Sequence, residues 1–188
     1  GPNTALQGLQ TIRNRSRDAG RNDWAGESSV QKWATALIGI GIKPRFPRIK
    51  SKTRKTALVD LFDDFVQQSD ADGVLNLYAQ QTLVVRSWLE SGEVFARRRA
   101  RFLDEDGLAV PMQVQLLEAD MVPLMDADSW KGLPVGNVIR SGIELNKRGK
   151  RVAYWVYKQH PGDKGFMGTM DPDALVRVAQ DFSMRHML

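Results

Sequence analysis

The stretch RSWLESGEVFARRRARF, residues 86–102, contains the point at which the periodicity of the chain changes. Upstream of Gly92, apolar residues recur every three or four positions, as they do along one face of an α-helix. Downstream of Gly92, the side chains alternate with a period of two, which is typical of a β-strand. Glycine also adopts readily the left-handed conformation that ends many helices. We therefore predict an α+β fold, with N-terminal amphipathic helices followed by an antiparallel sheet.

Three upstream segments have the apolar spacing of amphipathic helices. The first has Asp23 as its N-cap and ends at Gly39, and its apolar stripe is Val30, Trp33, Ala34, Leu37 and Ile38. The second has Leu58, Leu61, Phe62, Phe65 and Val66, with Asp60, Asp63 and Asp64 around its other side. The third has Val74, Leu77, Tyr78, Gln81, Val84, Val85 and Trp88. The short turn between the last two, residues 69–73, favours an antiparallel helical hairpin.

Five strands are predicted downstream of Gly92. After the first, the turn signal Asp104-Glu105-Asp106-Gly107 leads into a return strand with Val110, Met112, Val114 and Leu116 on one face. Ile139, Ser141, Ile143 and Leu145 predict a third strand, and Val152, Tyr154 and Val156 a fourth. Pro161-Gly162 ends the fourth strand, and residues 174–179 predict a fifth.

Composition excludes several classes of protein. The 188 residues contain no cysteine, so a disulfide framework and thiolate metal sites are excluded. No apolar run approaches the roughly 18 residues of a membrane span, and no membrane partner is expected. The net charge of +5 is uneven: residues 1–55 hold 12 Lys or Arg against 3 Asp or Glu, whereas residues 111–130 hold none against 4. Such blocks of like charge are consistent with separate surfaces that face different partners, and the alternative for any one block is an ordinary solvated face.

Two segments stand apart from the predicted elements. Residues 43–55 are rich in lysine, arginine and proline and hold no acidic residue, so they cannot readily bury themselves. We expect this segment to be an exposed, flexible linker. Gly1-Pro2 has the residues that a tag-removing protease leaves behind, and it is set aside as a tag remnant.

Motifs for catalysis or cofactor binding are weak in this sequence. The two histidines, His160 and His186, are too few for a histidine-rich metal site, and no Walker loop or Gly-x-Ser-x-Gly elbow occurs. Asp70-Ala71-Asp72-Gly73 is similar to the start of a calcium-binding loop, but position 12 of that loop is Gln81 instead of the required glutamate. The sequence therefore predicts no catalytic residue, no metal site and no cofactor.

Three arginines carry the one candidate contact surface. Arg97, Arg99 and Arg101 alternate along the first predicted strand, about 7 Å apart on one face, at a rise of 3.3–3.4 Å per residue. Spaced guanidinium groups suit phosphate, so these residues are candidates for nucleic-acid or subunit contact. The alternative is that they pair with acidic residues of a neighbouring helix, such as that of Asp60, Asp63 and Asp64, or of another subunit.

Several phrases, in this order, resemble the lambda-type portal proteins of tailed bacteriophages. They are LQTIRNRSRDAGRN (residues 9–22), IGIGI (38–42), RSWLESGEVF (86–95), QVQLLEAD (113–120), GIE (142–144) and GKRVAY (149–154). Ala119 and Ala179 stand where members of that family usually carry proline. Segments that follow Leu188 in the family, including the stem and the clip, are absent, so the chain is expected to be a fragment of a portal.

The resemblance implies a mechanical function and a set of partners. The full protein would form a ring, usually of twelve subunits, at one capsid vertex, through which double-stranded DNA is packaged and ejected. It would dock the terminase large subunit, the capsid shell and the head–tail connector, in the host cytoplasm during assembly and then in the virion. Residues 3–42 would be an N-terminal helical segment, 43–55 the basic linker, and 56–188 a wing domain with a helical hairpin and then an antiparallel sheet. No enzymatic role is implied.

Two other classes of function remain as alternatives. A basic DNA-binding module without catalytic activity is favoured by the charge of the first third of the chain, and salt-dependent duplex affinity would support it. A nuclease or processing enzyme would show divalent-metal-dependent cleavage.

Overall fold

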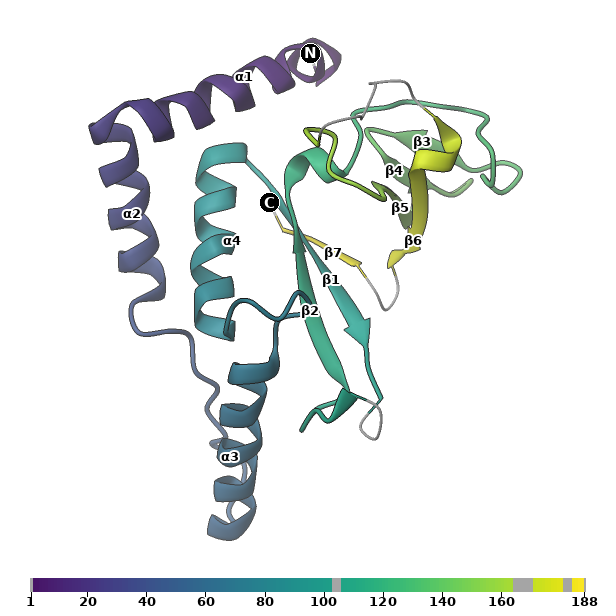
Figure 1. The fold of residues 1–188 in the computed structure, drawn as a ribbon. Coiled ribbons are helices and arrows are strands. Elements are labelled where there is room, and N and C mark those ends of the chain that lie inside the picture. Colours follow the sequence, from purple (N-terminus) through teal and green to yellow (C-terminus); the bar gives the residue numbers. More distant parts are fainter. Residues whose placement is uncertain (1, 103–105, 164–170, 181–183, 188) are drawn as a thin grey trace.

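The protein was analysed as a computed structural model, which describes residues 2–102, 106–163, 171–180 and 184–187 (Figure 1). In these ranges four α-helices precede two antiparallel sheets, which confirms the predicted α+β class. The helices are α1 (Pro2–Asn22), α2 (Trp24–Ile38), α3 (Lys52–Gln68) and α4 (Leu77–Ser91). None of the described helices combines the length and the apolar composition that crossing a bilayer requires.

Helices α1 and α2 meet at a tight corner. Asp23 is the N-cap of α2, as predicted, and its carboxylate accepts a hydrogen bond from the backbone N–H of Ala25 at 2.9 Å. A Cβ atom on Gly26 would lie 2.6 Å from the carbonyl oxygen of Ala19, so the two helices approach closely here. Gly39, with φ of +56°, ends α2, which confirms the predicted stop.

Helices α3 and α4 do not form the predicted hairpin. In Figure 1, α3 extends below α4, and α4 packs chiefly against α2. The reason lies in the intervening segment, which pairs with the second strand at Val114 instead of closing a turn between helices. The N–H of Val114 donates to the carbonyl of Ser69 at 2.7 Å, and the N–H of Ala71 donates to the carbonyl of Val114 at 3.0 Å. Helix α3 begins at Lys52, within the segment expected to be a linker.

The apolar stripes of α2 and α3 are less covered than their periodicity suggests. On α2, Ala34 is fully buried, but Trp33 is 60% and Leu37 49% exposed. On α3, Val66 is buried while Leu61 is 41% exposed. The helices are confirmed, but their apolar stripes are only partly buried, because periodicity marks the apolar side of a helix without supplying a partner for it.

The first sheet has the strand order β2-β1-β7 and carries the helices on one side (Figure 1). Its strands are β1 (Val94–Ala100), β2 (Met112–Leu117) and β7 (Met184–Met187). The change at Gly92 is confirmed, because this residue ends α4 with φ of +82° and β1 begins two residues later. Strand β7 was not predicted. Gly1, residues 104 and 105 of the predicted turn, and the side chain of His186 lie outside the described part.

The second sheet has the order β3-β4-β5-β6 and packs against the other face of β1. Its strands are β3 (Val138–Arg140), β4 (Ile143–Leu145), β5 (Arg151–Tyr157) and β6 (Leu175–Ala179). A core between the two sheets contains Phe95, Leu117, Val122, Tyr154, Val156 and Val178. The rings of Phe95 and Tyr154 meet edge to face, with their centroids 5.8 Å apart.

The predicted third strand is two strands joined by a tight turn. Ser141 and Gly142 both have positive φ, +50° and +75°, and reverse the chain between β3 and β4. This conformation suits a two-residue hairpin. Alternation of Ile139, Ser141 and Ile143 was therefore wrongly interpreted as one continuous strand.

Replacing Gly142 by alanine should destabilise the fold by about 2–3 kcal/mol, since a left-handed conformation costs a non-glycine residue roughly 1–3 kcal/mol. The added Cβ would also lie 2.5 Å from the carbonyl oxygen of Pro123. Gly149→Ala is the matched control, because Gly149 has φ of +73° but nothing within 4 Å of an added Cβ. Urea unfolding of both variants measures the difference, and equal losses would contradict the steric argument.

The basic segment leads to a prediction of proteolysis. Arg45, Arg48 and Lys50 precede α3 in a stretch without regular structure, and their side chains are exposed. Limited trypsin digestion should therefore cut after these residues before it cuts after Arg15 or Arg21, which are exposed but helical. Mass spectrometry of the first fragments identifies the cleavage sites. First cleavage inside α1 would show that the basic segment is docked and protected.

Candidate functional site

A buried arginine fixes α1 to the start of the first sheet. The side chain of Arg13 is 3% exposed, and its Nε donates to the carbonyl oxygen of Ser91 at 3.1 Å. Its guanidinium group also forms an ion pair with the carboxylate of Glu93. Burial lowers the pKa of Arg13, Asp120 opposes that change, and Arg17 adds to it. This arginine therefore depends on its acidic neighbours for its place in the interior.

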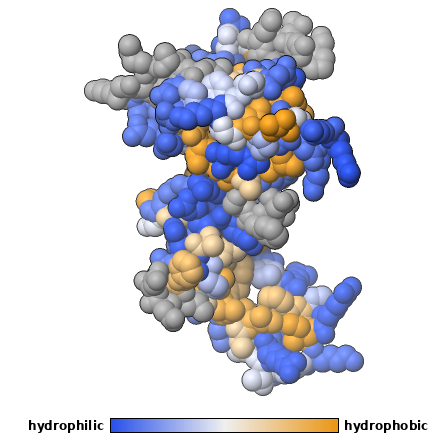
Figure 2. All heavy atoms as spheres, turned by 90° about the vertical axis from the view of Figure 1, so that its right-hand side faces the viewer, coloured by the Kyte–Doolittle hydropathy of each residue, from blue (hydrophilic) through white to orange (hydrophobic). Residues whose placement is uncertain are grey.

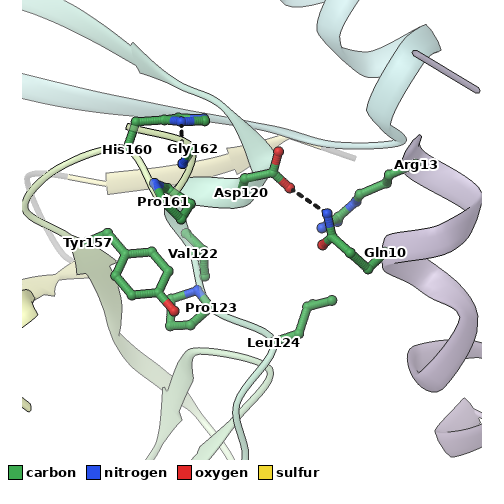
Figure 3. A pocket seen from close by; sticks show the side chains of 10 residues that line it. All are labelled: Gln10, Arg13, Asp120, Val122, Pro123, Leu124, Tyr157, His160, Pro161 and Gly162. Atoms are coloured by element: carbon green, nitrogen blue, oxygen red, sulfur yellow. Dashed lines mark hydrogen bonds between the residues drawn. The ribbon is translucent and has the colours of Figure 1, made fainter. Parts of the chain in front are cut away.

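Arg17, one helical turn further along α1, extends the contact to a third segment. Its Nε donates to Oγ of Ser91 at 3.0 Å, and its guanidinium group forms an ion pair with Asp120. Asp120 lies in the short 3-10 helix η1 (Ala119–Met121), which follows β2. Gln10 also donates to Asp120, at 3.5 Å (Figure 3). Residues four apart share a helix face, so Arg13 and Arg17 act from the same side of α1.

These contacts define the α1 junction, which consists of Arg13, Arg17, Ser91, Glu93 and Asp120. Its five residues come from three of the phrases singled out in the sequence, residues 9–22, 86–95 and 113–120. The phrases are far apart in the chain and meet in one network of ion pairs and hydrogen bonds. The sequence did not identify these residues as a site, because no local signal distinguishes Arg13 and Arg17 from the exposed Arg15 and Arg21.

A pocket of about 460 Å³ opens beside the junction. Its walls are Gln10, Arg13, Asp120, Val122, Pro123, Leu124, Tyr157, His160, Pro161 and Gly162 (Figure 3). Glu118, Asp120 and His160 each place one potential metal-ligand atom within 4.8 Å of the others. The carboxylate of Asp120 is engaged by Arg17 and Gln10, and Glu118 Oε2 lies 3.6 Å from Nε2 of His160. Of this cluster, Asp120 is therefore engaged by the junction, whereas Nε2 of His160 has no hydrogen-bond partner in the described part.

Another ion pair, between Glu144 and Arg177, lies within the second sheet. Glu144 on β4 is fully buried, and its carboxylate accepts from Nε and Nη2 of Arg177 on β6 at 2.6 and 2.9 Å. Asn137 donates to the same carboxylate at 2.6 Å. Burial tends to raise the pKa of Glu144, but the hydrogen bonds from Arg177 and Asn137 outweigh it and hold the pKa below its usual value. This bidentate pair ties β4 to β6 across β5.

The segment Asp70-Ala71-Asp72-Gly73, which is similar to the start of a calcium-binding loop, is a turn held by hydrogen bonds. The carboxylate of Asp70 accepts from the backbone N–H groups of Val74 and Leu75 at 2.9 and 2.8 Å, and from the side chain of Gln80 at 3.1 Å. Burial acts to raise the pKa of Asp70, but these hydrogen bonds lower it overall. All its strong acceptor positions face protein donors, in agreement with the interpretation of this phrase as a turn.

The structure separates the three predicted contact arginines. Arg97 and Arg99 lie in a hollow between the two sheets, together with Lys158, which follows β5. Burial and then the charge of Arg99 lower the pKa of Arg97. Arg101 lies at the end of the strand and donates to Oε1 of Gln113 at 2.7 Å. The three do not pair with the acidic residues of α3, because the described part contains no ion pair between these groups.

Comparison with known proteins places these features in a family. The sequence model for phage portal proteins of the lambda family matches residues 1–188. A probable portal protein of Halomonas phage phiHAP-1 is 25% identical over 162 residues, which are 82% of this chain and 30% of that protein. The chain thus spans about a third of the length of this relative.

Proposed function

Because this chain belongs to the lambda family of phage portal proteins, we propose that it is part of a subunit of a portal ring in a tailed phage or prophage. The ring would lie at one vertex of the capsid and form the channel for DNA packaging and ejection. The α1 junction carries this proposal most directly. The junction is built from three of the sequence segments that resemble the family. These segments share a physical role, because their contacts attach α1 to the other helices and to the sheets.

The partners follow from that role. The proposed partners are other copies of the subunit, twelve in the usual ring, together with the terminase large subunit, the capsid shell and the head–tail connector. Double-stranded DNA would pass through the channel, and the protein would act in the host cytoplasm during assembly and then in the virion. Residues 56–188 would form part of the wing of the portal, linked through the basic segment 43–55 to the N-terminal helices.

Exposed apolar surface supports assembly with other proteins. Several large apolar side chains are at least 60% exposed: Ile12, Trp24, Trp33, Ile40, Ile42, Val74, Phe102 and Val135. Figure 2 shows that, on the face it presents, apolar residues gather in an upper area and a lower area with hydrophilic surface between them. Contiguous exposed apolar surface is typical of sites of protein–protein contact.

The role proposed here is mechanical and not enzymatic. Four of the buried or partly buried charged groups in the described part, Arg13, Asp70, Asp120 and Glu144, are engaged in structural contacts. Arg97, Arg99 and Arg101 are proposed as contact residues, for a subunit or for DNA.

A packaging experiment tests this function. The gene that encodes this chain would be deleted from the phage or prophage that carries it and then restored from a plasmid. We expect deletion to abolish DNA-filled capsids while tails are still made, and the plasmid to restore them. Normal yields of filled capsids without the gene would overturn the proposal. If the chain were a DNA-binding module and not part of a portal ring, the deletion would produce no defect in rings or capsids. The purified chain would then show only salt-dependent binding to duplex DNA.

A further inference from the structure

The hollow between the two sheets gathers positive charge without a counter-charge. Arg97, Arg99 and Lys158 contribute to its wall, and no carboxylate is among the described residues that line it. The Nε atom of Arg97 is buried and has no hydrogen-bond partner within the described part. Burial lowers the pKa of Arg97, and the neighbouring Arg99 lowers it further. Like charges held together in a partly buried place are unfavourable unless an anion joins them.

The hollow has the size and charge to bind an oxyanion at the end of a narrow group, such as a side chain. Its volume is about 310 Å³, and the apolar side chains of Leu117 and Val156 line it together with the cationic residues. A carboxylate can accept two parallel hydrogen bonds from one guanidinium group. A hollow of this size between two sheets fits a single acidic side chain of a protein more closely than it fits the wide surface of a DNA duplex.

The chain itself presents such side chains on α3. Asp60, Asp63 and Asp64 are exposed, and none of them forms an ion pair with a described residue. Figure 1 shows α3 extending away from the two sheets. Asp72 accepts from Gln115, which lines the hollow, at 3.4 Å, and no ion pair between Asp72 and Arg97 or Arg99 occurs in the described part.

We infer that the hollow of one copy receives the acidic side of α3 from a neighbouring copy of this chain. The two surfaces differ, so the contact is heterologous, the kind that generates a ring when the rotation closes. Charge complementarity between the arginines and lysine of the hollow and the exposed acidic side of α3 supports this pairing. The inference rests on the ring proposed above and assigns one of its subunit contacts.

Cysteine cross-linking tests the contact, because the natural chain contains no cysteine. Val176→Cys places a thiol at the hollow and Val59→Cys places one on α3, and both leave every charge intact. Under oxidising conditions at high protein concentration, the double variant should form a ladder of dimers, trimers and larger products. A mixture of the two single variants should stop at dimers, and each single variant should give only background.

The charge dependence of the cross-link identifies its cause. Arg97→Gln with Arg99→Gln should lower the cross-linking rate about 10-fold or more, as loss of a hydrogen bond to a charged group does. Arg98→Gln, an exposed arginine of the same strand, is the control and should leave the rate unchanged. The triple substitution Asp60→Lys, Asp63→Lys and Asp64→Lys on exposed α3 should also abolish the ladder. Circular dichroism would show that each variant is folded.

Other outcomes overturn the inference and separate it from the proposed function. A ladder that is insensitive to Arg97 and Arg99 would mean that the copies meet elsewhere. If those substitutions reduced affinity for a DNA duplex about 10-fold and left cross-linking unchanged, the hollow would be a DNA surface. If filled capsids depend on the gene but no cross-link forms between positions 59 and 176, this contact alone is refuted. If filled capsids do not depend on the gene and no cross-link forms, the ring is refuted as well.

Discussion

Replacing Arg13 by methionine should destabilise the fold by about 3–5 kcal/mol, the cost of removing one partner from a buried ion pair. Methionine keeps the apolar length of the side chain but removes the donor that Arg13 supplies to the carboxylate of Glu93 and to the carbonyl of Ser91. Glu93 is 15% exposed, so water compensates it only in part. Because Arg13 attaches α1 to the start of β1, the loss should appear as earlier unfolding in urea, followed by circular dichroism.

Two further variants separate pairing from helix propensity. Arg15→Met lies on the same helix, but Arg15 is exposed and forms no ion pair among the described contacts, so its loss should change stability by less than about 0.5 kcal/mol. The double variant Arg13→Met with Glu93→Gln should be less destabilised than the sum of its two single variants, since the ion pair that each single variant breaks is the same one. Additive losses, or equal losses at positions 13 and 15, would contradict a coupled ion pair.

The second large effect is expected at Arg177. Methionine there would leave the fully buried carboxylate of Glu144 without its cation, at a cost of about 3–5 kcal/mol at neutral pH. Lys131→Met is the control, because the Lys131–Asp173 ion pair is well exposed and its loss should not change stability measurably. A similar loss in the two variants would show that burial does not govern the strength of these pairs.

This effect should depend on pH in a defined direction. In the natural chain Arg177 and Asn137 hold the pKa of Glu144 below its usual value, so the stabilisation is fully present above the unfolded pKa of about 4.3 and is lost as pH falls through the folded pKa. In Arg177→Met, burial would raise that pKa instead, and Glu144 would become neutral as pH falls. The stability difference between the two proteins should therefore shrink between pH 7 and pH 4. Urea unfolding at both values measures it, and a constant difference would contradict the assigned role of Glu144.

The sequence predicted local structure better than it predicted contacts. Gly92 marks the change from helix to strand, and Asp23 and Gly39 mark the ends of α2, because caps and stops depend on residues close in the chain. The hairpin at Ser141 was missed because alternation continues unchanged through a two-residue turn. Gly142 was the only local signal of that turn.

Long-range contacts explain the other differences. The predicted hairpin of α3 and α4 fails because Ser69 and Ala71 hydrogen-bond to β2, which nothing near those residues in the sequence reveals. Arg13 is buried and Arg15 exposed for a similar reason, since Ser91 and Glu93 lie about 80 positions away and decide which arginine has partners. The resemblance to a family singled out residues 9–22, 86–95 and 113–120, and the structure shows that they meet at the α1 junction.

Electron microscopy of the purified full-length product of the gene that encodes this chain tests the portal assignment most directly. We expect closed rings with a central channel and rotational symmetry, twelve-fold in the usual case. In the averaged images, each repeat should contain one copy of the two sheets with α1 attached through Arg13 and Arg17. Single particles without rotational symmetry, at concentrations at which the protein is folded and soluble, would contradict the portal assignment.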